Sequence, residues 1–362
     1  MTTRATRARA ARLAAALLTP LLGARAAQAQ HQHAPAPAPA TAPSGKPVGD
    51  PSGARAAGPS SGPLGSQLSE PSGTLVVAHG GDSLWNAGVR AAARAARTNG
   101  PVEVSFLMGP GARDARFQDA VARLAARGAR AVVVVPMLVS SHSGHYDQIR
   151  YLAGEPVALD SAMQHHLHMA GIARPDSATR ARVALRVAPA LDDAPELARV
   201  LADRARALAD SIGDAPARRA LLIVGHGPNS AEDYAAWMGN LRPVADSVRR
   251  WTGFRDVRVE LVRDDAPPAV RAEAVRRVRE LVDLQRAATG RDVLVVPVLV
   301  SKGQVSRDKL PADLRGTPSV YAGEPLLPHA AVARWVERRV AEAGTRTPGR
   351  AQVGAGPAEA PR

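Results

Sequence analysis

The chain has 362 residues, a formal net charge of +14, 45% hydrophobic and only 3% aromatic residues, and no cysteine. This length allows two domains with cores built from Ala, Val and Leu, while the lack of cysteine excludes disulfides, thiolate metal sites and cysteine nucleophiles. Arginine supplies most of the positive charge along Ala-rich stretches without interleaved aromatic residues, so we expect solvated helix faces and no nucleic-acid partner.

Residues 1–29 have the pattern of a secretory signal peptide. Arginines up to Arg12 precede the short apolar stretch Leu13–Leu22, and Ala27-Gln28-Ala29 fits the small-x-small cleavage pattern. The apolar stretch is too short to span a bilayer, and no later segment reaches that length. We therefore expect an exported protein, periplasmic or extracellular, without a transmembrane segment.

Two further segments have compositions that do not support a packed core. Residues 30–73 are rich in Pro, Ala, Gly and Ser, and they are predicted to form a disordered linker. Residues 344–362 are a Gly/Pro/Ala-rich stretch without periodicity, predicted to be a disordered tail. Between them lie two halves, residues 74–212 and residues 213–343.

The first half alternates short apolar runs with amphipathic stretches. Apolar runs bounded by Gly or polar residues predict buried strands, and apolar residues three and four apart predict helices. The exception is a His/Met-rich insert, residues 155–180, which we expect to be irregular. The predicted strands cover 75–78, 102–107, 131–139 and 183–187, and the predicted helices cover 83–97, 114–127, 148–152 and 193–211.

The second half repeats this order. Its third strand contains Val296–Ser301, which matches Val135–Ser140 of the first half closely. Alternating strands and helices predict right-handed βαβ units and parallel sheets. The expected fold is α/β, with two flavodoxin-like halves, each a mostly parallel four-stranded sheet with helices on both faces. The predicted strands cover 220–224, 257–262, 293–300 and 319–321, and the predicted helices cover 230–250, 267–288, 306–314 and 329–343.

Histidines stand where several of these strands end. His79 follows the first strand, His142 and His145 follow the third, and His226 follows the first strand of the second half. In a parallel sheet such residues share the edge where α/β proteins bind ligands. Neutral imidazole is a good ligand for Co²⁺, Ni²⁺, Fe²⁺ and Zn²⁺, and it accepts protons near neutral pH. We therefore predict a metal-handling site at this edge.

The insert is a second candidate metal-binding segment. It carries His165, His166 and His168, flanked by Met163 and Met169. Imidazole and thioether together suit Cu and Ni and accept Zn. The insert is expected to be an exposed loop that collects metal, or a solvated loop whose histidines have no role.

The strand-end motifs resemble those of the class II tetrapyrrole chelatases, the sirohydrochlorin cobaltochelatases and ferrochelatases. The first motif is a strand ending in a His-Gly turn, here Val77-Ala78-His79-Gly80-Gly81. The second is a Val-Pro strand followed by a loop with Gly and His, here Val135-Pro136-Met137-Leu138-Val139 with His142, Gly144-His145 and Asp147-Gln148-Ile149. The two halves match the long, tandem members of this family.

This resemblance implies an activity and its residues. The protein would insert a divalent metal, Co²⁺, Fe²⁺ or Ni²⁺, into an anionic tetrapyrrole of the sirohydrochlorin type, with the metal as substrate. His79 and either His142 or His145 would hold the metal and accept pyrrole protons. No organic cofactor is predicted, since the chain lacks the glycine-rich dinucleotide and phosphate-binding motifs.

Two departures from the family pattern leave alternatives open. Met108 stands in the phrase Phe106-Leu107-Met108 where the family often has an acid, and the second-half loop Ser301–Asp308 has no histidine. The first alternative is a metal or tetrapyrrole carrier without catalysis. The second is a two-lobed binding protein for small molecules in which the histidines are structural.

Overall fold

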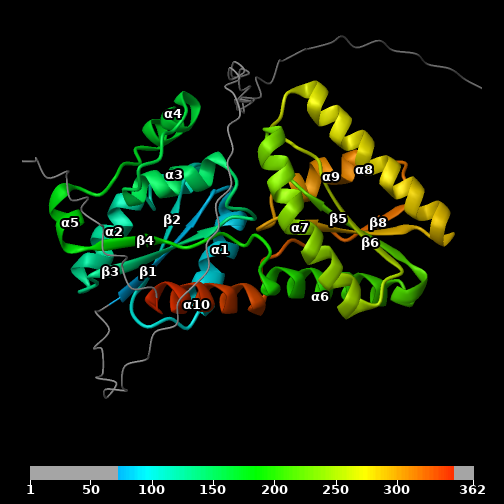
Figure 1. Cartoon of the computed structure of the whole chain (residues 1–362), viewed down its shortest axis with the longest axis horizontal. Helices are drawn as coiled ribbons and strands as arrows, with labels where there is room; N and C mark the ends of the chain where they lie inside the picture. Colours follow the sequence, from blue (N-terminus) through cyan, green and yellow to red (C-terminus); the bar gives the residue numbers. More distant parts are fainter. Residues whose placement is uncertain (1–71, 346–362) are drawn as a thin grey trace, which may run out of the picture. The chain divides into compact units, whose positions relative to one another are not determined.

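The computed structural model describes residues 72–345 (Figure 1). The predicted signal peptide, residues 1–29, lies outside the described residues, as do nearly all of the predicted linker and tail. The first strand begins at Ser72, so the last two residues of the predicted linker pair with the neighbouring strand. No helix within residues 72–345 is both long and apolar enough to cross a membrane.

The first half contains a four-stranded sheet in the order β2-β1-β3-β4. Every pairing in it is parallel, and Ala78 at the end of β1 lies opposite both Phe106 and Met137. The residues that follow β1, β2 and β3 therefore meet at one edge of the sheet. The strands are β1 (Ser72–Ala78), β2 (Val102–Phe106), β3 (Ala131–Met137) and β4 (Ala184–Val187).

The second half repeats the arrangement with the order β6-β5-β7-β8, again entirely parallel. Gly225 at the end of β5 pairs with Leu261 and Val298, as Ala78 does with its neighbours in the first sheet. The predicted fold class is confirmed. The strands are β5 (Ala220–Gly225), β6 (Asp256–Leu261), β7 (Val293–Val298) and β8 (Ser319–Tyr321).

Helices connect the strands in both halves. Asp82 caps the first of them by accepting a hydrogen bond from the Trp85 backbone N–H at 2.8 Å. A π-helical turn at Val305–Lys309 leads into the short helix α9. The helices are α1 (Ser83–Ala95), α2 (Phe117–Ala126), α3 (Gly144–Ala153), α6 (Pro195–Ser211), α7 (Ala231–Thr252), α8 (Pro268–Thr289), α9 (Leu310–Asp313) and α10 (Ala330–Thr345).

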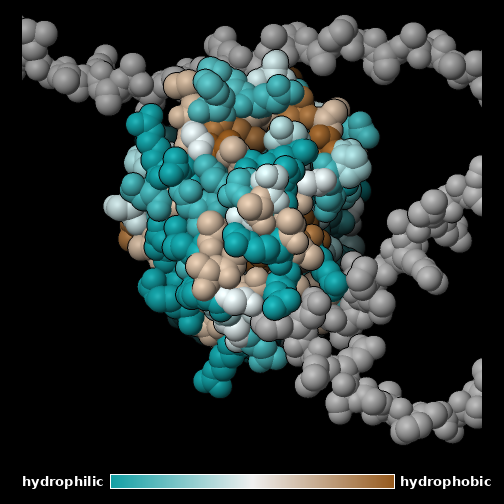
Figure 2. Space-filling model, turned by 90° about the vertical axis from the view of Figure 1, so that its left-hand side faces the viewer, coloured by the Kyte–Doolittle hydropathy of each residue, from teal (hydrophilic) through white to brown (hydrophobic). Residues whose placement is uncertain are grey.

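The insert at residues 155–180 is helical, so the prediction of irregular structure was wrong. It forms α4 (Ser161–Ala170) and α5 (Ser177–Arg182). Asp160 caps α4 and Gly171 ends it in a left-handed conformation, while Met163 and Leu167, four residues apart, are its buried side chains. Figure 2 shows the face on the left of Figure 1, where hydrophilic side chains predominate and apolar ones show between them.

The last helix of each half packs on the sheet of the other half. α6 follows β4 but contacts β7 and α7, whereas α10 follows β8 but contacts β3 and α1 (Figure 1). The two helices also touch each other, where the Arg338 guanidinium donates to both carboxylate oxygens of Glu196 at 2.7 and 2.8 Å. One continuous apolar core therefore includes residues of both halves.

Trp335 of α10 tests this exchange, because its side chain is fully buried in the shared core. We expect Trp335→Ala to lower the free energy of unfolding by about 3–5 kcal/mol, from lost apolar burial and the cavity left behind. Urea denaturation measures this. Trp251→Ala removes a tryptophan that is 43% exposed and should cost about 1 kcal/mol or less. An equal loss of unfolding free energy in the two variants would contradict the conclusion that the core depends on α10.

Candidate functional site

His79 stands directly after β1, on a turn that only glycine can continue. Gly80 has a φ of +96°, and a Cβ there would lie 2.1 Å from the Met108 carbonyl oxygen. The His79 Nδ1 lies 2.7 Å from the Gly80 carbonyl oxygen. Because a carbonyl oxygen only accepts hydrogen bonds, Nδ1 carries the proton and Nε2 keeps a free lone pair.

His145 lies in the first turn of α3, which begins after the cap residue Ser143. Its Nδ1 is 2.8 Å from Oε1 of Gln148, and the Gln148 Nε2 donates to the Met163 carbonyl oxygen at 2.8 Å. The Met163 carbonyl fixes the orientation of this buried amide, so Oε1 faces the imidazole. His145 therefore also has its proton on Nδ1 and a free lone pair on Nε2.

The rings of His79 and His145 are neighbours. Their centroids are 4.7 Å apart and their planes meet at 84°. Burial lowers the pKa of His79, and burial together with the neighbouring His79 lowers the pKa of His145 to about 3. Both imidazoles are thus neutral at physiological pH, which is the form that binds a metal ion or accepts a proton.

His142, the other candidate partner of His79, lies differently. It is exposed, and its backbone carbonyl accepts a hydrogen bond from Nε1 of Trp237 at 2.6 Å. Within the described part of the chain, the ring that contacts His79 from this loop is that of His145. His142 joins the loop to α7 through its backbone.

The three histidines of the insert lie on α4. His165 and His168 are exposed, whereas His166 is partly buried. The charge of His166 contributes to the low pKa of His145. The helix α4 therefore carries two exposed histidines and one that is partly buried.

His226 takes the place of His79 in the second half but has a different environment. Its Nδ1 lies 2.8 Å from the Gly227 carbonyl oxygen, and its Nε2 lies 3.1 Å from Oδ2 of Asp265 and 4.0 Å from Oδ2 of Asp264. Burial works to lower the pKa of His226, but the two carboxylates, above all the hydrogen bond to Asp265, raise it. His226 is thus hydrogen-bonded to an acid that favours its protonated form.

Asp264 and Asp265 are site residues that the sequence analysis missed. Together with His226 they form a cluster of three potential metal ligands within residues 72–345. One ligand atom from each of the three residues lies within 4.8 Å of the other two. Their position in the sequence could have indicated them. They follow β6, the strand beside β5, and therefore lie at the sheet edge that carries His226.

The loops at the two sheet edges are joined directly. The Arg307 guanidinium pairs with Asp82 at 2.9 Å, and the Ser301 hydroxyl donates to the Trp85 carbonyl oxygen at 3.1 Å. The Trp85 ring in turn lies 6.4 Å from that of His79. The sheet edge with the paired imidazoles and the sheet edge with His226 are therefore linked by side-chain contacts.

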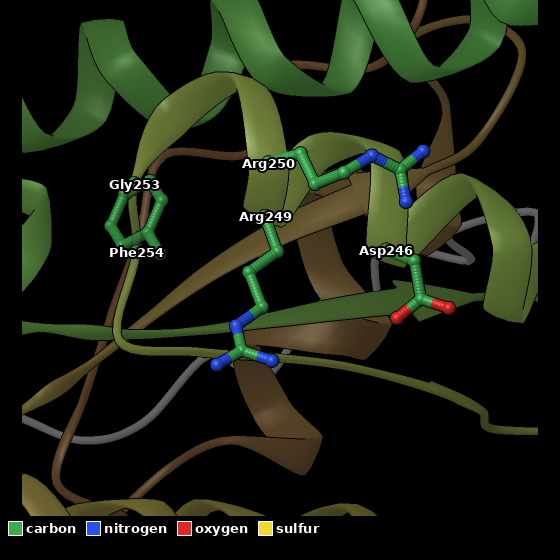
Figure 3. A pocket seen from close by; sticks show the side chains of 5 residues that line it. All are labelled: Asp246, Arg249, Arg250, Gly253 and Phe254. Atoms are coloured by element: carbon green, nitrogen blue, oxygen red, sulfur yellow. The ribbon is translucent and has the colours of Figure 1, made fainter.

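Two cavities lie elsewhere in the described part of the chain. One, of about 340 Å³, is at the C-terminal end of α7, where Asp246, Arg249 and Arg250 extend in different directions and Phe254 lies to one side of them (Figure 3). The other, of about 200 Å³, lies between α6 and β7. No candidate histidine lines either cavity.

Comparison with known proteins shows which part of the chain resembles a described family. Residues 73–208 match the CbiX family model, while no curated protein sequence matches the chain. The structure of SirB from Bacillus subtilis with Fe³⁺ matches 76% of this chain and 96% of its own, with a TM-score of 0.51 and 16% identity.

Two other solved structures are similar. SirB from Bacillus subtilis subspecies spizizenii in complex with cobalt matches with a TM-score of 0.49 and 14% identity, covering 76% of this chain and 95% of that one. CbiX, described as the terminal enzyme of sirohaem biosynthesis in denitrifying bacteria, matches with a TM-score of 0.45 and 16% identity, covering 75% and 98%. The family match and the shared SirB fold confirm the resemblance to class II chelatases.

Gly80→Ala tests the turn that presents His79. The new Cβ would meet the Met108 carbonyl, so the turn must open. Gly128→Ala is the matched control, because Gly128 also has a positive φ, +88°, but a Cβ there meets nothing within 4 Å. We expect Gly80→Ala to lower the free energy of unfolding by about 1–3 kcal/mol more than the control, measured by urea denaturation. Equal losses would show that the turn has room.

The low pKa of His145 makes stability depend on pH. Between the ordinary value of 6.5 and the folded value of about 3, the unfolded chain binds a proton that the folded one does not. The metal-free protein should therefore lose about 1–2 kcal/mol of unfolding free energy through this residue between pH 7 and pH 5. In His145→Gln, urea denaturation should show a smaller decrease of the unfolding free energy between pH 7 and pH 5. The exposed-residue variant His165→Gln is the control, and an equal change in both would contradict the assignment.

Proposed function

We propose that this chain, which carries a CbiX-family domain over residues 73–208, inserts a divalent metal ion into a tetrapyrrole of the sirohydrochlorin type. The supporting observation is the pair of neutral imidazoles, His79 and His145, with their rings 4.7 Å apart. Their Nε2 lone pairs suit Co²⁺, Fe²⁺ or Ni²⁺ as the metal substrate. The predicted signal peptide supports a site of action outside the cytoplasm.

The chemistry requires both a metal holder and a proton acceptor. A free-base tetrapyrrole gives up two pyrrole N–H protons as a divalent metal enters, so charge and atoms balance when two protons leave. His79 and His145 would first hold the metal through Nε2. Once the metal passes to the macrocycle, the same two lone pairs are free to receive the two protons and release them to water.

Specific features favour a second candidate function, a carrier that binds metal or tetrapyrrole without turnover. Met108 follows β2 with a thioether where a carboxylate is common in the family, and α4 presents His165 and His168 at the surface. A carrier would change the absorbance of the bound macrocycle and leave the rate of metal insertion at its uncatalysed value.

The purified protein is mixed with sirohydrochlorin and excess Co²⁺, and the macrocycle absorbance is followed against a protein-free control. We expect a protein-dependent rate that falls about 100-fold or more in His79→Ala and in His145→Ala, because each loses a metal-holding and proton-accepting group. His142→Ala, which removes an exposed ring, should keep most of the rate.

Three results would count against this assignment. Full activity of His79→Ala would exclude the paired imidazoles as the site. Loss of activity in His142→Ala but not in His145→Ala would reassign the second ligand. A spectral shift without faster insertion would establish the carrier function instead.

A further inference from the structure

The first half lacks a carboxylate at the end of β2, whereas the second half has two at the end of β6. Leu107 and Val262 hold equivalent positions, since their backbone N–H groups bond to the carbonyls of Ala78 and Gly225, the last residues of β1 and β5. The chain then continues to Met108 in one half and through Arg263 to Asp264 and Asp265 in the other. The carboxylate that is absent after β2 is therefore present at the corresponding strand end of the second half.

The two acids have different roles. The Asp264 side chain is 1% exposed and paired with Arg271 at 3.0 Å and Lys309 at 2.6 Å, so two cations neutralise it. The Asp265 side chain is 58% exposed and hydrogen-bonds to His226. Asp264 therefore anchors the loop, while Asp265 is the carboxylate that remains accessible to a ligand.

The loop that carries Asp265 is tied to the turn that carries His79. Asp82, three residues after His79, pairs with Arg307. Lys309, two residues after Arg307, pairs with Asp264, the neighbour of Asp265. These two ion pairs place the Asp265 loop on the side of the paired imidazoles.

We propose that Asp265 is the third protein ligand of the metal substrate, joining Nε2 of His79 and Nε2 of His145 from the other half. This inference rests on the proposed metal-handling function of the two histidines. Two imidazoles and one carboxylate form a set that suits Fe²⁺ and Co²⁺ and leaves coordination positions open for transfer. His226 is then a positioning residue, which holds the Asp265 carboxylate when no metal is bound.

Binding of Co²⁺ alone tests the proposal without the tetrapyrrole. Metal-free full-length protein is titrated with Co²⁺ in competition with a chelator, and the visible absorption of bound Co²⁺ is recorded. We expect Asp265→Asn to weaken binding about 10-fold or more and to shift the Co²⁺ absorption, because a charged ligand becomes a neutral amide. Asp265→Glu, which keeps the carboxylate, should restore part of the affinity.

The matched control is Asp308→Asn, which removes the same charge from an exposed residue beside Lys309. It should bind Co²⁺ within about 2-fold of the unmodified protein, since screened surface charges contribute little. Circular dichroism and thermal unfolding check that each variant is folded. Equal losses in Asp308→Asn and Asp265→Asn, with an unchanged spectrum, would show a general charge effect and overturn the proposal.

Two further variants separate the possible failures. If His79→Ala loses Co²⁺ binding and Asp265→Asn does not, the histidine site stands and only the role of Asp265 is wrong. If His226→Gln and Asp265→Asn lose binding while His79→Ala keeps it, the metal lies wholly in the second half, which overturns the shared site. Absence of Co²⁺ binding by the unmodified protein would remove both this inference and the proposed function.

Discussion

The exchange of α6 and α10 is the constraint on which the rest of the structure depends. Each sheet has one face covered by a helix that the other half supplies, so neither sheet buries its apolar surface without the other. Burial of apolar area is the main favourable term in folding. The same term that stabilises the core therefore also fixes how the two strand edges, and the side chains on them, are placed.

Within that frame the two repeats place their strand-end histidines in different electrostatic environments. His79 and His145 donate from Nδ1 to a carbonyl or amide oxygen, and burial keeps them neutral. His226 makes the same Nδ1 contact, but its Nε2 meets Asp265, which favours the imidazolium. One sequence feature, a strand ending in His-Gly, thus gives an Nε2 lone pair in one half and an Nε2 hydrogen bond to a carboxylate in the other.

The sequence predicted the features that depend on local pattern. Apolar runs located the strands, and the His-Gly turn after Ala78 placed His79 at the sheet edge. The choice between His142 and His145 depended on where α3 begins, which the Ser143 cap decides and periodicity does not reveal. The swapped contacts of α6 and α10 were not predictable either, because an amphipathic pattern shows that a helix buries a face but not which sheet it covers.

The helix exchange also bears on symmetry. A single half on its own would leave a sheet face uncovered, and a second copy could cover it by trading the same helix, which gives an isologous two-fold dimer. In such a dimer every residue appears twice, so a change that improves one site is imposed on the other. Joining the copies in one chain removes that coupling. Each half can then differ from the other, and here a histidine pair stands on one half and an acidic pair on the other.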